Sequence, residues 1–149
     1  MKTKFRKIAA LALSLVLICA LAAAVYAYEV SEAGVKVWCY DVQFHTLVEG
    51  DGTYVRAEMI EDVSGNGNYN STVTLNYTYC PADQNRPSAY VSGKVVHTFT
   101  RYTGLKYADY TLNGNSYLMV DATGTTVVTK TVNGTTYTTE AAPVTIYIN

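Results

Sequence analysis

Charged residues, histidine, proline and cysteine are all scarce in this chain of 149 residues. Charged side chains make up 15% of the sequence, which contains three prolines, three cysteines and two histidines. Transition-metal sites usually need three or four converging ligands, and neither histidine belongs to a His-x-His or Glu-x-x-His pair. The sequence also lacks the Gly-x-Ser-x-Gly turn that exposes a catalytic serine. These absences predict a protein that is not an enzyme and has no catalytic residue, metal or cofactor.

The two histidines, His45 and His97, form only a weak candidate site. Both lie on predicted strands beside apolar residues. A metal site would have to combine them with Asp41 or Asp109 through the fold. Histidines that are exposed or hydrogen-bonded are the preferred interpretation.

The densest acidic cluster comprises Glu58, Glu61 and Asp62. A glycosidase needs two carboxylates across a cleft, whereas Glu58 and Glu61 fall on opposite faces of a regular strand. Calcium binding by Glu61 and Asp62 with Asn66 and Asn68 would use suitable oxygen ligands. The Asp-x-Asp-x-Asp spacing of a calcium loop is absent, so a solvated turn is the preferred interpretation.

The first 27 residues have the three parts of a secretory signal peptide. Four basic residues precede position 8, an apolar run follows over residues 8–25, and small or short residues precede a cleavage site after Ala27. We expect a signal-peptide helix over 1–27 and a single secreted, extracellular domain over 28–149. An uncleaved anchor is the alternative, because 18 apolar residues reach the lower limit for spanning a bilayer.

The predicted mature chain is mildly acidic. Its seven basic and twelve acidic residues give a net charge of about −5. Nucleic acids and anionic membranes both require a basic surface. We therefore expect neither nucleic acid nor, after removal of the signal, a membrane as partner.

Two cysteines, Cys39 and Cys80, remain in the predicted mature chain. In an oxidising environment, two cysteines of one small domain most often pair. We therefore predict a Cys39–Cys80 disulfide, with thiols or intermolecular pairing as the alternatives.

Alternating apolar and polar residues, with abundant Tyr, Thr and Val, are typical of β-strands. The strands predicted from this pattern cover residues 35–47, 53–61, 71–79 and 89–101, the two arms of each of two hairpins, and 144–148. The result is an all-β protein, an antiparallel β-sandwich of about eight strands. The topology, immunoglobulin-like or jelly-roll-like, stays open.

The two hairpins are predicted from Asn-Gly pairs, the strongest short-range signal for a two-residue turn. Asn113-Gly114 would pair Tyr110 with Tyr117, Ala108 with Met119, and Lys106 with Asp121. Asn133-Gly134 would pair residues 128–132 with 135–139, and this second hairpin is so polar that we expect it at a sheet edge or protruding.

Fourteen tyrosines exceed what a small core needs, because a tyrosine hydroxyl requires water or a partner. Tyr69, Tyr90, Tyr102 and Tyr107 lie near predicted loops or strand ends and form a candidate binding surface. We expect a secreted, non-enzymatic binding or interaction module for an unknown extracellular protein or glycan. The alternatives are a self-assembling structural subunit, a secreted antimicrobial or toxin, and a small hydrolase.

The signal peptide can be tested by the mass of the exported protein. We expect intact mass spectrometry to show a chain beginning at Tyr28. The substitution A27R should block cleavage, because the peptidase reads a small residue at this position. Recovery of the unsubstituted protein with Met1 still attached would contradict the prediction.

Overall fold

The protein is built from β-strands in two antiparallel sheets. The computed structural model describes residues 29–81, 90–112 and 117–148. This part of the chain contains no helix, so it contains none long and apolar enough to cross a membrane. The predicted signal peptide and its cleavage site after Ala27 lie outside the described residues.

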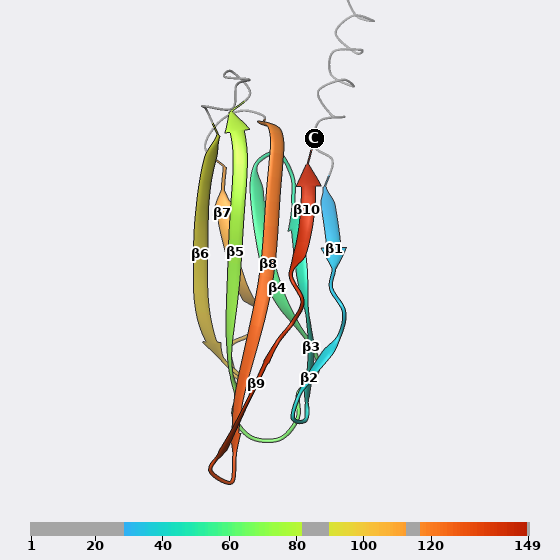
Figure 1. Cartoon of the computed structure of the whole chain (residues 1–149), viewed down its shortest axis with the longest axis vertical. Helices are drawn as coiled ribbons and strands as arrows, with labels where there is room; N and C mark the ends of the chain where they lie inside the picture. Colours follow the sequence, from blue (N-terminus) through green and yellow to red (C-terminus); the bar gives the residue numbers. More distant parts are fainter. Residues whose placement is uncertain (1–28, 82–89, 113–116, 149) are drawn as a thin grey trace, which may run out of the picture.

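The two sheets have similar layouts (Figure 1). Sheet A has the order β1 (Val30–Ala33), β3 (Val42–Gly50), β4 (Tyr54–Val63) and β7 (Lys106–Thr111), with β2 (Val37–Cys39) also paired to β3. Sheet B has the order β10 (Val144–Ile148), β8 (Tyr117–Val132), β5 (Asn70–Pro81) and β6 (Val91–Thr100), with β9 (Thr135–Glu140) also paired to β8.

Two short strands share one edge of each sheet. Strand β4 pairs along β3 from Gln43 to Gly50, so β1 and β2 must lie end to end on the other side of β3. In the same way β5 occupies one side of β8, and β10 and β9 divide the other side between them.

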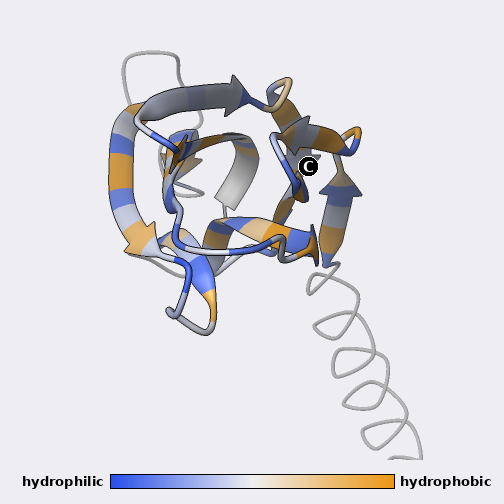
Figure 2. Ribbon diagram, turned by 90° about the horizontal axis from the view of Figure 1, so that it is seen from below, coloured by the Kyte–Doolittle hydropathy of each residue, from blue (hydrophilic) through white to orange (hydrophobic). Residues whose placement is uncertain are grey.

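The core lies between the sheets, where alternate residues of both point inward. On β3, residues alternate between buried and half-buried along the whole strand. Figure 2 shows the same alternation of apolar and polar residues in the two layers. The core takes side chains from both sheets, among them Phe44, Val48, Val55, Val73, Leu75, Val128 and Ile146. The buried hydroxyls of Thr46 and Thr126 join the sheets by a 2.9 Å hydrogen bond.

Strands from different sheets also meet along the sides of the molecule. On one side β1 lies against β10 and β2 against β9, and on the other side β6 lies against β7. His97 Nδ1 on β6 is 3.1 Å from the carbonyl oxygen of Tyr107 on β7. Thr139 Oγ1 on β9 donates a 3.0 Å hydrogen bond to the carbonyl oxygen of Trp38 on β2.

The prediction of one long strand over residues 35–47 is wrong. The chain turns back at Tyr40 and Asp41, so that Cys39 pairs with Val42 and Val37 with Phe44. Apolar residues occupy both sequence faces because the segment is two strands, each with its own inward face.

The prediction of a hairpin at Asn113-Gly114 is also wrong, although the turn itself lies outside the described residues. Strand β7 belongs to sheet A, where Ala108 pairs with Ala57, whereas β8 belongs to sheet B, where Met119 pairs with Cys80. Strand β5 pairs along one side of β8, and β10 and β9 pair along most of the other side.

The ion pair between Lys106 and Asp121 is absent for the same reason. Lys106 is buried, donates to the carbonyl oxygen of Thr103 and lies 3.7 Å from Glu61. Asp121 lies on β8, paired with Thr78 and Tyr147.

The hairpin at Asn133-Gly134 is confirmed in every predicted pair, from Val132 with Thr135 to Val128 with Thr139. Both turn residues have positive φ, 50° and 80°, as the tight turn of the preferred type requires. The hairpin protrudes at one end of the molecule (Figure 1), as expected from its polarity.

The structure contains no Cys39–Cys80 disulfide, so this prediction is not supported. Both cysteines are buried thiols. Cys39 donates to the carbonyl oxygen of Val128 at 3.4 Å, whereas Cys80 pairs with Met119, nine residues away along β8. At about 3.3 Å per residue the cysteines are about 30 Å apart, far beyond the reach of a disulfide.

Gly124 permits the close approach of the two sheets. A Cβ atom at this position would lie 2.5 Å from Val48 Cγ2 and 2.7 Å from Ala57 Cβ, both on the opposite sheet. Overpacking of a core commonly costs 1–3 kcal/mol. We therefore expect G124A to lower the free energy of unfolding by about 2 kcal/mol, measured by urea denaturation.

Gly104 provides the matched control, because a Cβ atom there would meet nothing within 4 Å. We expect G104A to change stability by less than about 0.5 kcal/mol. Equal effects of the two substitutions would contradict the proposed close contact.

Candidate functional site

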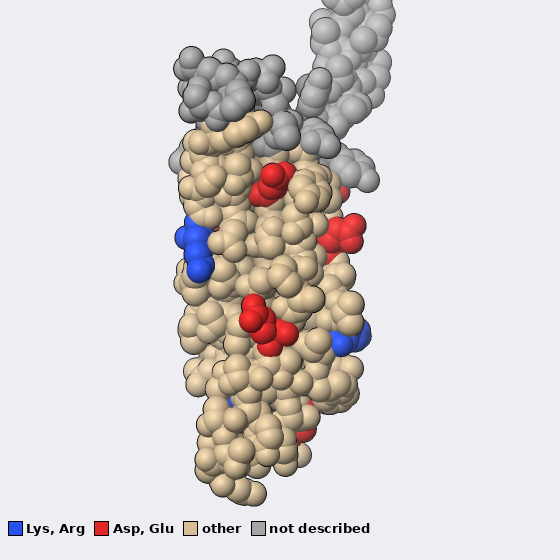
Figure 3. All heavy atoms as spheres, in the orientation of Figure 1, with Lys and Arg blue, Asp and Glu red and all other residues tan. Residues whose placement is uncertain are grey.

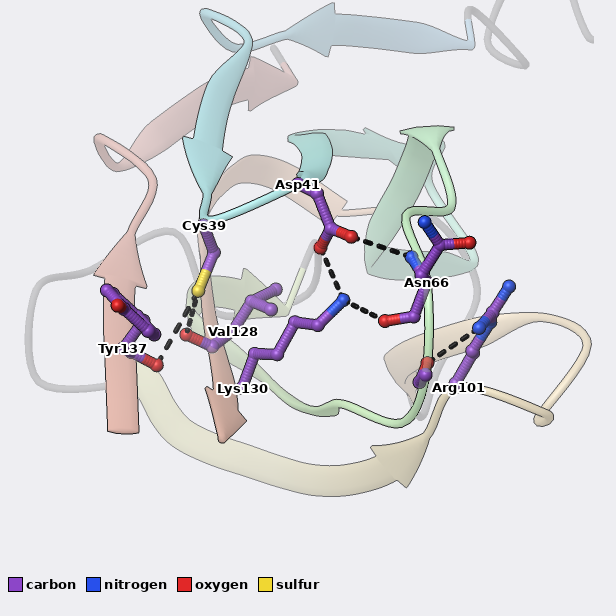
Figure 4. A network of polar contacts seen from close by, with 8 residues as sticks. Cys39, Asp41, Asn66, Arg101, Val128, Lys130 and Tyr137 are labelled. Carbon is purple, nitrogen blue, oxygen red and sulfur yellow. Dashed lines mark hydrogen bonds and ion pairs between the residues drawn. The ribbon is translucent and has the colours of Figure 1, made fainter. Parts of the chain in front are cut away.

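A buried ammonium group organises one end of the molecule (Figure 4). The side chain of Lys130, on the inward face of β8, is only 2% exposed. Its Nζ donates to Asp41 Oδ1 and to the backbone oxygen of Asn66. It also lies 5.8 Å from the centre of the Tyr40 ring. One lysine thereby links sheet B to the β2–β3 turn and to the loop between β4 and β5.

Asp41 is the counter-charge and also holds that loop. Its Oδ2 accepts a 2.7 Å hydrogen bond from the backbone N–H of Asn66. Gly65 allows this contact, because its φ is +60° and a Cβ atom would lie 2.5 Å from Asp41 Oδ1. The hydrogen bond from Lys130, followed by that from Asn66, holds the pKa of Asp41 below its usual value.

Arg101 extends the contacts to the segment after β6. Its Nη1 donates a 2.6 Å hydrogen bond to the backbone oxygen of Gly67. The backbone N–H of Arg101 donates a 3.0 Å hydrogen bond to the carbonyl oxygen of Tyr69. We call Asp41, Asn66, Gly67, Arg101 and Lys130 the Lys130 network. It ties together segments of both sheets that are far apart in the sequence.

Tyr40 has a backbone conformation that is unusual for its size. Its φ is +56°, in the left-handed region that favours glycine. Such a conformation costs about 1–2 kcal/mol and persists when the surroundings fix it. Here the neighbouring Asp41 is held by Lys130 and Asn66. The strain brings no burial of the ring in return, because Tyr40 is 54% exposed.

One further aromatic ring contacts that of Tyr40, and Trp38 lies two residues before Tyr40 in the chain. The ring of Tyr137 on β9 is 4.9 Å from that of Tyr40, centre to centre, and is also exposed. Trp38, the single tryptophan of the chain, is 53% exposed on neighbouring β2. We call Trp38, Tyr40 and Tyr137 the aromatic surface.

The charged groups at the centre of the Lys130 network, Lys130 and Asp41, are engaged with other groups of the protein. The Lys130 ammonium is buried and engaged by two oxygens and a ring, and the Asp41 carboxylate is engaged by two donors. Cys39 is buried, with its thiol 3.4 and 3.6 Å from the carbonyl oxygens of Val128 and Tyr137. This arrangement is suited to hold a turn and its aromatic rings in place.

The four predicted tyrosines do not form one surface. Tyr69 is buried, so its assignment to a binding surface is wrong. Tyr90 and Tyr102 are exposed but lie at opposite ends of β6. Tyr107 is half-buried on the outer face of sheet A, with the Arg56 guanidinium 4.4 Å above its ring.

The two histidines lie in different sheets, so the fold does not bring them together. His45 Nδ1 is 2.7 Å from Asp62 Oδ2, and Lys36 also donates to Asp62. A register shift between Gln43 and Phe44 places Asp62 beside His45. Partial burial acts to raise the pKa of Asp62, but the two donors hold it below its usual value.

The acidic residues considered for a glycosidase or a calcium site are also dispersed. Glu58 lies on the outer face of sheet A, where partial burial, and then the nearby Glu49, raise its pKa. Glu61 lies near Lys106, and the oxygen of Asn66 accepts from Lys130. Among the described residues no group of three or more His, Cys, Asp or Glu could hold a metal.

The sequence held two signals for this site that the strand pattern concealed. Lys130 falls between Val128 and Val132 on one predicted face, which places a charge among core residues. Trp38 and Tyr40 fall on the second apolar face of the segment 35–47. A buried lysine needs a counter-charge, but the sequence does not single out Asp41, because only the turn at Tyr40 brings the two together.

Comparison of the chain with models of protein families, with curated proteins and with solved structures gave no match.

Removal of the Asp41 charge should be worse for stability than removal of Lys130. D41N leaves a buried ammonium without a counter-charge, whereas K130M removes the charge that requires one. We expect D41N to lower the urea midpoint more than K130M does. Addition of K130M to D41N should raise the midpoint again, and additive losses in the double variant would contradict this coupling.

The same pair predicts a loss of stability in acid. The unfolded chain protonates Asp41 near pH 4, whereas the folded chain resists protonation to a lower pH. The contribution is therefore present above about pH 4 and is lost as the pH falls through the lower folded-state pKa. We expect K130M to lose less stability than the unsubstituted protein between pH 5 and pH 2, measured by urea denaturation. Parallel pH profiles would contradict the assignment.

Proposed function

We propose that this protein is a secreted β-sandwich that binds an extracellular protein or glycan without chemical conversion, through its aromatic surface. The observation that carries the proposal is the strained and exposed Tyr40. Backbone strain that the surrounding structure maintains is concentrated at functional sites. Strain that serves only stability would be expected to bury the ring.

The composition of the aromatic surface supports binding. Trp and Tyr give a large contact area and lose little conformational entropy on binding, and they are enriched among residues that dominate binding energy. The Lys130 network fixes the turn that bears Tyr40, and a fixed contact residue reduces the entropy that binding costs.

Self-assembly, hydrolysis and attack on membranes are less well supported than binding. Self-assembly would pair the edge strands of two molecules, and in this fold the edge strands β6 and β7 lie against each other across the two sheets, although no ladder joins them. A hydrolase would need converging carboxylates, and Asp41, Asp62 and Glu61 each lie beside a lysine. The acidic charge of the predicted mature chain does not favour attack on membranes.

Two substitutions at Tyr40 separate binding from stability. Y40A and Y40G both remove the ring, but only glycine relieves the positive φ. We expect Y40G to be more stable than Y40A by about 1 kcal/mol, and both to bind at least about tenfold more weakly. Labelled protein should first be screened on glycan and extracellular-protein arrays.

Fluorescence of Trp38 then reports where each array ligand binds, because no other tryptophan is present. A ligand at the aromatic surface should shift the emission of Trp38 and protect it from acrylamide quenching. Y102A is the control, since Tyr102 is exposed and lies outside the aromatic surface. The proposal would be overturned if no array ligand changed Trp38 emission, or if the ligands that change it bound Y40A as tightly as the unsubstituted protein.

A further inference from the structure

We propose a second binding site, for a neutral polysaccharide chain, on the outer face of sheet B around Tyr147 and Asp121. It is independent of the aromatic surface. Tyr147 on β10 is 65% exposed. The outward-facing side chains of the neighbouring strand β8 at this point, Asp121 and Thr123, are half-buried and so less exposed than Tyr147. The direct neighbour of Tyr147 in the register is Asp121.

Two rows of polar side chains cross the four strands at this point. The first row is Tyr147, Asp121, Thr78 and Ser92, and the second is Thr145, Thr123, Asn76 and Lys94, each in cross-strand register. Hydroxyl pairs fix the orientation of both rows, with 2.8 Å between Thr78 and Ser92 and 2.7 Å between Thr123 and Thr145. Strands about 4.8 Å apart hold these groups at regular intervals.

The groups in these rows match the chemistry of a sugar. A carboxylate is acceptor-only and can accept from two neighbouring hydroxyls, while an amide and hydroxyls both donate and accept. An exposed aromatic ring offers an apolar face to the C–H groups of a pyranose. Asp121 is half-buried on the outer face of β8, and its carboxylate makes no hydrogen bond or ion pair with any residue that the structure describes.

The electrostatic character of the face favours a neutral chain over a charged one. In register, the rows contain one acidic and one basic residue, at Asp121 and Lys94. Figure 3 shows this face with only scattered charged side chains over β5, β8 and β10. A polyanion or polycation would find no matching patch of charge here.

The site lies far from the aromatic surface. Asp121 and Lys130 are nine residues apart on β8, which corresponds to about 30 Å along the strand. Trp38 fluorescence should therefore not respond to a ligand on sheet B, and failure of one proposal leaves the other open to its own test.

Affinity electrophoresis of the purified protein tests the site. The probes are neutral polysaccharides in the gel: a water-soluble ether of β-1,4-glucan, a soluble β-1,3-glucan, xylan and galactomannan. We expect at least one to retard the protein, and Y147A and D121N each to weaken that interaction about tenfold. Trp38 emission should stay unchanged.

Two matched controls should leave retardation intact. Y102A removes a tyrosine that is 78% exposed elsewhere, and D109N removes a carboxylate from the outer face of sheet A. Absence of retardation by all four polysaccharides, or equal loss in the controls, would overturn the proposal. So would concentration-dependent dimerisation that Y147A abolishes, because a second copy would then occupy the face.

Discussion

The structure at one end of this molecule depends on the need to neutralise the buried ammonium group of Lys130. A lysine on an inward position of β8 cannot reach water, so a counter-charge must come from another part of the chain. Asp41 supplies it, and this requirement fixes the β2–β3 turn, the loop after β4 and, through that loop, the segment after β6. The same charge pair therefore stabilises the fold and sets the position of the exposed aromatic rings.

Part of the fold could be predicted because alternation records which residues point inward. It did so for β4 and β5, and an Asn-Gly turn specified the register of β8 and β9. The prediction that the strands on either side of Asn113-Gly114 pair with each other was wrong, because a local turn preference does not determine which strand is the better partner. Strand β7 pairs instead with β4, and β5 pairs with β8 over twelve residues. Pairing between distant strands depends on the sum of many contacts, which no local pattern contains.

The candidate site was largely beyond sequence reasoning for a related reason. Its aromatic rings, Asp41 and Lys130 come from three segments, and Asn66, Gly67 and Arg101 come from two more. The turn that brings them together has neither glycine nor asparagine at Tyr40, where φ is positive, so the usual turn chemistry gave no signal. A position near a predicted loop does not show that a tyrosine is exposed, because Tyr69 is buried. Exposure depends on what packs above a residue, and here it is decided by the opposite sheet.

The shared edges of the two sheets have a consequence for how the domain can be displayed. Val30 begins β1 beside Gly50, and the side chain of Ile148, at the end of β10, also reaches Gly50. Chain entry and exit therefore lie side by side, at the end away from the Asn133-Gly134 turn (Figure 1). If both points were joined to a larger scaffold, the opposite end of the molecule, with the Asn133-Gly134 turn, would point away from that scaffold. The same closeness would let a short peptide link the two points, so that the chain could be opened at another turn.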